Sequence, residues 1–119
     1  MDEAAMDRLF AALAHPERRR MLDVLRARPG VSIRELSEGF SMSAVGVLKH
    51  VRVLEAAGLV VSRKAGRERK LFFNAVPIQA VYDRWTDEYS AFWVSHVADL
   101  KERLESRRES PAKKGARRA

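Results

Sequence analysis

Residues 32–74 read SIRELSEGFSMSAVGVLKHVRVLEAAGLVVSRKAGRERKLFFN, and the order of the predicted elements is clearest in this part of the chain. Ser32 followed by Glu35 matches a capping box, which opens a short helix ending near Gly39. After a turn at residues 41–43, a second helix is predicted to run to Gly58. The apolar residues 59–61 and 70–73 indicate two strands joined through a turn at Gly66. The stretch therefore predicts a helix, a turn, a second helix and a hairpin, in that order.

Basic side chains crowd the predicted hairpin. Five cations surround the turn at residues 65–68, where Glu68 is the one acid: Arg63, Lys64, Arg67, Arg69 and Lys70. This density of positive charge favours a polyanion, and its place directly after helix, turn and helix indicates duplex DNA. Arginine and lysine contacts to phosphates supply affinity without reading the sequence. The alternative interpretation is a winged-helix protein-interaction module that binds an acidic partner.

The second predicted helix has two faces. Val47, Val51 and Leu54 fall together on a helical wheel and form the expected buried face. The opposite face is expected to enter the major groove, with its two cations on phosphates or, alternatively, solvated as ordinary surface charges. His50 lies nearer the buried side, where we expect a satisfied interior histidine more than a DNA contact. Helix and hairpin together give these predicted DNA-binding residues: Ser41, Ser43, Ala44, Val45, Leu48, Lys49, Arg52, Arg63, Lys64, Arg67 and Arg69.

Amphipathic helices are predicted on both sides of this stretch. Residues 3–14 carry apolar side chains at helical spacing, and Pro16 starts a further helix that ends before Pro29. From Pro77, apolar and aromatic residues recur every three or four positions to about Glu105, which predicts one long helix. Its aromatic stripe is expected to pack on a second chain, with a ligand pocket as the alternative. The predicted dimer interface comprises Met6, Leu9, Phe10, Leu13, Tyr82, Trp85, Tyr89, Phe92 and Trp93.

The fold class is predicted as mainly α with a small β-hairpin. A chain of 119 residues fits one domain, which we place at residues 1–106. We expect a winged helix-turn-helix with long N- and C-terminal dimerisation helices, the latter at about residues 77–106. Residues 107–119 are basic and lack large apolar side chains, so we predict a disordered tail there.

Composition excludes several classes of protein. The chain has no cysteine, which rules out disulfides and thiolate metal sites. No apolar run approaches the roughly 18 residues of a membrane span, and the first ten residues are acidic, unlike a signal peptide. We therefore expect a cytoplasmic protein that associates with the nucleoid when bound to DNA. No phosphate-binding loop or nucleophile motif is present, so we predict no enzymatic activity and no cofactor.

Several segments resemble the ArsR family of bacterial winged-helix repressors. They are HPERRRMLDVL, MSAVGVLKHVRVLEAAGLV, RKAGRERKLFFN and PIQAVYDRW, and they cover roughly residues 5–105. GVLKHVRVLEAAGLV and VPIQAVYDRW resemble the branch often encoded beside small SRPBCC-type proteins. The resemblance implies a homodimeric repressor, built on the first and last helices, that binds a palindromic operator. Where many members have Gln-Pro followed by Ser, this chain has Ala44, Val45 and Leu48, which can meet only thymine methyl groups or the sugar backbone.

Metal sensing is known in this family, and the sequence argues against it here. The family's thiolate site needs cysteine, which this chain lacks. The family's second site, on the final helix, falls here on Asp83, Trp85, His96 and Asp99. Tryptophan cannot bind a metal, so a nitrogen ligand is lost and zinc affinity should fall heavily. We predict no metal site, we interpret His15 as an N-cap or surface residue, and the sequence identifies no small-molecule effector.

Overall fold

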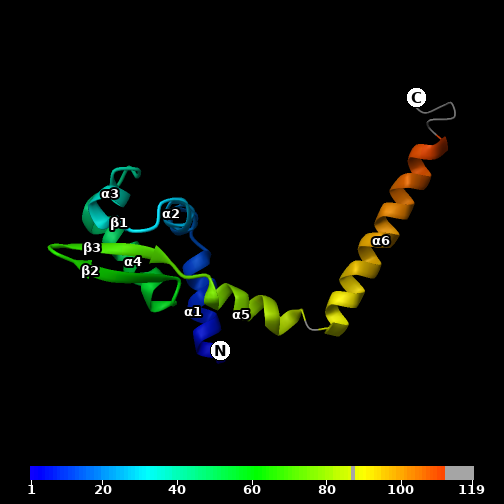
Figure 1. Cartoon of the computed structure of the whole chain (residues 1–119), viewed down its shortest axis with the longest axis horizontal. Helices are drawn as coiled ribbons and strands as arrows, with labels where there is room; N and C mark the ends of the chain where they lie inside the picture. The colour runs from blue at the N-terminus through cyan, green and yellow to red at the C-terminus, as the bar shows by residue number, and fades with distance from the viewer. Residues whose placement is uncertain (87, 112–119) are drawn as a thin grey trace. The chain divides into compact units, whose positions relative to one another are not determined.

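The computed structural model describes residues 1–86 and 88–111 (Figure 1). The chain divides into two compact units, residues 1–81 and a second unit that begins at Tyr82. The elements follow in this order: α1 (Glu3–Leu13), α2 (Pro16–Ala27), β1 (Val31–Ser32), α3 (Ile33–Ser37), α4 (Ala44–Ala56), β2 (Val60–Ala65), β3 (Glu68–Phe73), α5 (Val76–Trp85) and α6 (Glu88–Pro111). Within the described ranges, no helix combines the length and the apolar character needed to cross a membrane.

Each of the first four helices begins after a residue whose side chain accepts a hydrogen bond from the first turn: Asp2, His15, Ser32 and Ser43. Such caps satisfy backbone N–H groups that the helix itself leaves without partners. At α3 the predicted capping box is confirmed, because Ser32 accepts from the N–H of Glu35 while Glu35 accepts from the N–H of Ser32. The predicted N-cap role of His15 is also confirmed, with Nδ1 accepting from the N–H of Glu17 at 3.2 Å.

A continuous hydrophobic core joins α1–α4 to the sheet. Its largest fully buried side chains come from all of these elements: Leu9, Met21, Leu25, Leu36, Val47, Val51, Leu54, Leu59 and Leu71. The predicted buried faces of α2 and α4 are confirmed by this set. In α1 the buried positions are Met6, Leu9 and Ala12, while Phe10 remains 44% exposed. Phe10, which the sequence places in the dimer interface, is thus available for contact with a second chain, and Ala12 joins the core of the single chain.

The sheet has three strands in the order β1-β3-β2, all antiparallel. The sequence indicated only a hairpin, and its strands are longer than predicted, since pairing continues to Ala65 opposite Glu68. The extra strand β1 pairs Val31 with Leu71, next to Gly30, whose N–H donates to the carbonyl of Leu71. This short strand fixes the base of the hairpin against the start of α3.

The predicted long helix from Pro77 to Glu105 is two helices, α5 and α6. Thr86 follows the last residue of α5, and its hydroxyl donates to the carbonyl of Tyr82. A hydroxyl bond of this kind can bend a helix, and Thr86 is the first residue after α5 that is not helical. α6 continues to Pro111, so residues 107–111 are helical where a disordered tail was predicted. The rest of that predicted tail, residues 112–119, lies outside the described residues.

Candidate nucleic-acid interface

The helix-turn-helix consists of α3, the turn at residues 38–43 and α4. Four of the side chains predicted to face DNA are exposed on α4: Ala44, Val45, Lys49 and Arg52. Leu48, which was predicted with them, is half-buried. In the preceding turn Ser41 is exposed, and Ser43 caps α4 with its Oγ 3.1 Å from the backbone nitrogen of Gly46. The first turn of α4 therefore presents a positive helix end with small and apolar side chains.

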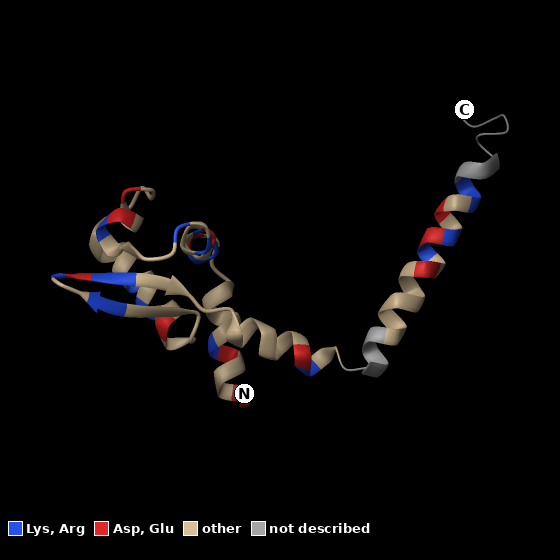
Figure 2. Ribbon diagram, in the orientation of Figure 1, with Lys and Arg blue, Asp and Glu red and all other residues tan. Residues whose placement is uncertain are grey.

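The hairpin of β2 and β3 places like charges directly opposite each other. Arg63 pairs with Lys70 and Lys64 pairs with Arg69, while Arg67 occupies the turn beside Gly66 at φ 64°. Lysine and arginine gather along this hairpin, which extends beyond the helices of its unit (Figure 2). Opposed cations destabilise a strand pair, since each repels the other across the ladder. Within the described residues, no carboxylate forms an ion pair with these cations.

The basic side chains of the hairpin differ in how firmly they are held. Arg69 is exposed, yet its Nε and Nη2 donate to Oγ of Ser62 at 3.3 and 3.0 Å. Lys70 is half-buried near the capping box of α3. The pKa of Glu35 lies below its usual range, first because the N–H of Ser32 donates to its carboxylate, then because of the Ser32 hydroxyl, Lys70 and Arg28. Arg63, Lys64 and Arg67 are exposed and are the cations best placed to reach a ligand.

A polar cluster at the start of α2 touches the helix-turn-helix. Arg18 donates from Nε and Nη2 to the carbonyls of Ala12 and Ala11, at 2.7 and 2.9 Å. Its Nη1 lies 3.2 Å from Nδ1 of His50 on α4, and the His50 ring lies 4.6 Å from that of His15. His50 is therefore satisfied within the protein, as predicted. Burial, followed by His15 and then Arg18, lowers the pKa of His50 from its ordinary 6.5.

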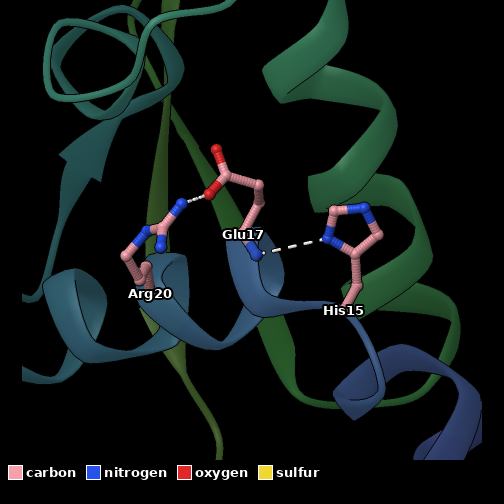
Figure 3. Close-up of polar contacts among 3 residues, drawn as sticks. All are labelled: His15, Glu17 and Arg20. Atoms are coloured by element: carbon pink, nitrogen blue, oxygen red, sulfur yellow. Dashed lines mark hydrogen bonds and ion pairs between the residues drawn. The ribbon is translucent and has the colours of Figure 1, made fainter.

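Three neighbouring residues complete the start of α2: Glu17, Arg19 and Arg20. Glu17 pairs with Arg20 one turn later, beside the His15 cap (Figure 3). Arg19 donates from Nη1 to the carbonyl of Leu13 at 2.7 Å, so two arginines of α2 cover the last carbonyls of α1. The sequence did not reveal the role of Arg18. Nothing in local spacing distinguishes it from the arginines at 19 and 20, since its partners come from α1 and α4.

The predicted dimer residues separate into two groups. Met6 and Leu9 are buried in the single chain, where they cannot contact a second chain, so we remove them from the predicted interface. Leu13 is partly buried against the core of the single chain and stays in the predicted interface. The exposed members are Phe10 on α1, Tyr82 and Trp85 on α5, and Phe92 and Trp93 on α6. The side chain of Tyr89 lies outside the described residues.

The residues considered for a metal lie on α5 and α6. His96 stacks on Phe92 with ring centroids 5.2 Å apart and meets Trp93 edge-on at 6.0 Å. Among the residues that the structure describes, no three His, Cys, Asp or Glu side chains gather as a metal site would require. The positions of the family's second site, Asp83, Trp85, His96 and Asp99, therefore do not belong to a described cluster of three possible metal ligands. That metals leave DNA affinity unchanged stays a prediction.

Comparisons with known proteins agree with this geometry. Residues 13–63 match the family model described as a helix-turn-helix domain. The chain is 34% identical over 87 residues to the uncharacterized HTH-type transcriptional regulator YuzN of Bacillus subtilis, covering 68% of this chain and 95% of that protein. The part of the chain that matches the family model, residues 13–63, contains both α3 and α4 of the helix-turn-helix.

Solved structures extend the likeness to the whole fold. An ArsR-like transcriptional regulator from Rhodococcus sp. RHA1 is 30% identical with a TM-score of 0.65, covering 87% of this chain and 93% of that one. The homodimeric winged helix-turn-helix DNA-binding domain Mb0332 of Mycobacterium bovis is 21% identical with a TM-score of 0.58, covering 71% and 83%. The second likeness shows the fold alone. Taken with the capped helix-turn-helix and its basic hairpin, these relatives show that the chain belongs to the ArsR family of winged helix-turn-helix transcriptional regulators.

Proposed function

We propose that this transcriptional regulator acts as a homodimeric repressor that binds a palindromic operator. In this proposal α4 enters the major groove and the β2–β3 hairpin lies on the flanking sugar-phosphate backbone or the adjacent minor groove. The observation that carries the proposal is the hairpin, where Arg63 faces Lys70 and Lys64 faces Arg69.

The opposed pairs Arg63–Lys70 and Lys64–Arg69 repel each other within the single chain. Each opposed pair lowers the stability of the strand ladder, by a few tenths to about 1 kcal/mol. Phosphates of duplex DNA would relieve this repulsion, and the counterions that they release would add affinity. Binding to DNA would therefore explain why the hairpin keeps opposed cations that lower the stability of the folded chain.

The apolar face of α6 supports a dimer. Its large apolar residues recur at spacings of four, three and four positions and are each about half exposed in the single chain: Trp93, Val97, Leu100 and Leu104. This is the spacing of a helix seam that packs on another helix. The Mycobacterium bovis protein of the same fold is homodimeric. A two-fold dimer presents two copies of α4, so its operator should be a palindrome.

Repression follows from occupancy. A dimer seated on a promoter excludes other proteins from the same DNA, and this requires no further surface. Activation would require an additional contact with another protein. We therefore infer repression as the outcome of operator binding.

Selection from a random duplex pool, followed by binding measurements, tests the proposal. At moderate salt the recovered operator should bind about a thousandfold or more tightly than a scrambled duplex. Arg67→Ala should weaken binding to both duplexes alike and lower the slope of log affinity against log salt by about one unit, as expected for one lost phosphate contact.

Arg26→Ala provides the matched control, because Arg26 is an equally exposed arginine in the last turn of α2. It should leave the salt slope almost unchanged. A protein-interaction module would instead bind the operator and the scrambled duplex equally at every salt concentration. That result would reject the proposed function.

A further inference from the structure

The first turn of α4 exposes apolar side chains that the fold does not use. Val45 is 63% exposed, and Ala44 beside it is also exposed. The core takes its α4 contacts from Val47, Val51 and Leu54. A branched apolar side chain with most of its surface in water contributes little to the packing of the single chain. Its place on the helix-turn-helix points to a contact with the bound DNA.

The polar groups around Val45 do not supply a base-reading pair. The side chains that read adenine or cytosine by hydrogen bonds are Asn, Gln, Asp and Glu, and residues 44–53 contain none of them. The Oγ of Ser43 is engaged by the N–H of Gly46 as the helix cap. Lys49 and Arg52 are exposed one and two turns further along the same face as Val45, where they can reach phosphates or guanine.

Gly46 gives a second, independent indication of close approach. The atoms nearest to a Cβ added at this position would be Ser43 Oγ at 3.5 Å, Met42 Sδ at 3.6 Å and Met42 Cβ at 3.8 Å, which are ordinary contacts. Packing inside the chain therefore does not require a glycine. Glycine in a helix is nevertheless unfavourable relative to alanine. A missing side chain next to Val45 lets another molecule come closer to the first turn of α4.

We propose that Val45, assisted by Ala44, recognises the C5-methyl groups of thymine in the major groove of the operator. The proposal rests on the proposed function, since it assumes that α4 enters the major groove. Among the groups that base edges display there, the thymine methyl is the apolar one, and all others are donors or acceptors. Val45 has neither a donor nor an acceptor, so contact with a methyl group is its favourable interaction with a base. The sequence alone allowed these side chains to contact either thymine methyl groups or the sugar backbone. The proposal here is contact with the methyl groups.

Replacing thymine by deoxyuridine tests this directly, because the change removes only the methyl group. An operator recovered from the random pool is synthesised with single deoxyuridines at each thymine position in turn, and dissociation constants are measured by fluorescence anisotropy. At one or two positions in each half-site, affinity should fall about fourfold, the effect of one buried methyl group. At the same positions, a 5-methylcytosine pair should bind better than a cytosine pair, because it restores the methyl group.

The protein variants connect this effect to Val45. Val45→Ser removes both methyl groups of the valine side chain and leaves a hydroxyl in their place, so it should abolish the preference for thymine over deoxyuridine at the position that Val45 contacts. Val76→Ser is the matched control, because Val76 is a similarly exposed valine, 69% accessible at the start of α5. Equal binding of thymine and deoxyuridine operators at every position would overturn the inference, as would a preference that Val45→Ser leaves unchanged at every position. If no sequence is enriched from the pool, the proposed function fails first, and the inference falls with it.

Discussion

Arg18 connects three parts of the molecule through one guanidinium group. Two of its nitrogens bond carbonyls at the end of α1, and a third contacts Nδ1 of His50 on α4. A guanidinium group has donors only, so Nδ1 of His50 must be the acceptor and must carry no proton. The last turn of α1 has no basic residue of its own, so Arg18 also compensates the negative end of that helix. The position of α4 against α1 and α2 therefore depends on a neutral His50.

The first prediction concerns pH. Because the folded protein lowers the pKa of His50 below 6.5, the unfolded chain binds the proton more readily. The contribution of His50 to stability is thus fully present above pH 6.5 and is lost as the pH falls below 6.5 towards the folded pKa. Protonation also places a cation against Arg18 and His15 and removes the acceptor. Thermal unfolding midpoints should fall more steeply for the wild type than for His50→Gln between about pH 7 and about pH 5.

His96→Gln serves as the control for this experiment. His96 stacks on Phe92 within α6 and has no contact with Arg18 in the described structure. Its replacement should leave the difference in midpoint between the two pH values close to that of the wild type. An equally steep fall in His50→Gln would show that another group is responsible.

At the level of single residues, the sequence predicted the α4 core well and the edges less well. Val47, Val51 and Leu54 lie where a helical wheel puts them, because burial on a regular helix follows its period. Leu48 is half-buried at the margin of the apolar face, where its burial depends on which neighbouring element covers it. That coverage is set by long-range packing, which a local period does not contain. The contact from Arg18 to His50 is also long-range and has no local signal.

Among the elements, the β2–β3 hairpin shows a conflict between stability and binding. Val60 and Leu71 bury its base, while its outer half holds Lys64 opposite Arg69. Arg69 is further oriented by Ser62, which keeps its positive charge on this part of the ladder. A strand pair selected only for stability would not place two cations opposite each other.

The second prediction tests this conflict with Lys64→Thr. The change removes one member of an opposed pair and introduces a residue that strands favour, so the free energy of unfolding should rise by up to about 1 kcal/mol. DNA affinity should fall at the same time. Repulsion is screened by salt whereas strand preference is not, so part of the gain should disappear between about 50 mM and about 1 M salt. Denaturant unfolding at both salt concentrations measures it.

Glu68→Gln gives the opposite change in the same hairpin. It removes the acid opposite Ala65 and leaves all the cations in place, so stability should fall slightly and DNA affinity should rise. If Lys64→Thr is destabilising at low salt, repulsion between the opposed cations does not govern the hairpin.

The order of elements could be predicted from the sequence, but two elements could not. Strand β1 has two residues, Val31 and Ser32, and forms because β3 lies beside it. Two residues are too few to show the alternation of apolar and polar side chains by which a strand is recognised in a sequence. The break between α5 and α6 interrupts an apolar pattern that continues on both sides of it. Thr86 is compatible with a helix in isolation, and its hydroxyl contact to Tyr82 is visible only in the structure.

On the scale of the whole molecule, the unit that begins at Tyr82 has no buried core of its own in the described chain. The large apolar residues described on α6 are all exposed in the single chain: Phe92, Trp93, Val94, Val97, Leu100 and Leu104. Among them, Trp93, Val97, Leu100 and Leu104 lie on one face of α6, and an exposed apolar face of this kind is a marker of association in soluble proteins. The second copy of the chain is the partner that the proposed palindromic operator requires.

The third prediction is that Phe92→Glu produces a monomer. Phe92 is 57% exposed in the single chain, so the charge should leave the folded unit of residues 1–81 intact and act on the association of two chains. The dimer dissociation constant should rise about 30-fold or more, as for the loss of a large aromatic contact in an interface. Light scattering at micromolar concentration should then give the mass of one chain, against the mass of two chains for the wild type.

Ser106→Glu is the matched control for Phe92→Glu, since it adds the same charge at an exposed polar position of α6 and should stay dimeric. The monomer should keep its affinity for a half-site and lose the tighter binding to the full palindrome, because the two reading helices are no longer linked. A wild-type protein that is monomeric under these conditions would contradict the dimer, and a dimeric Phe92→Glu would place the interface elsewhere.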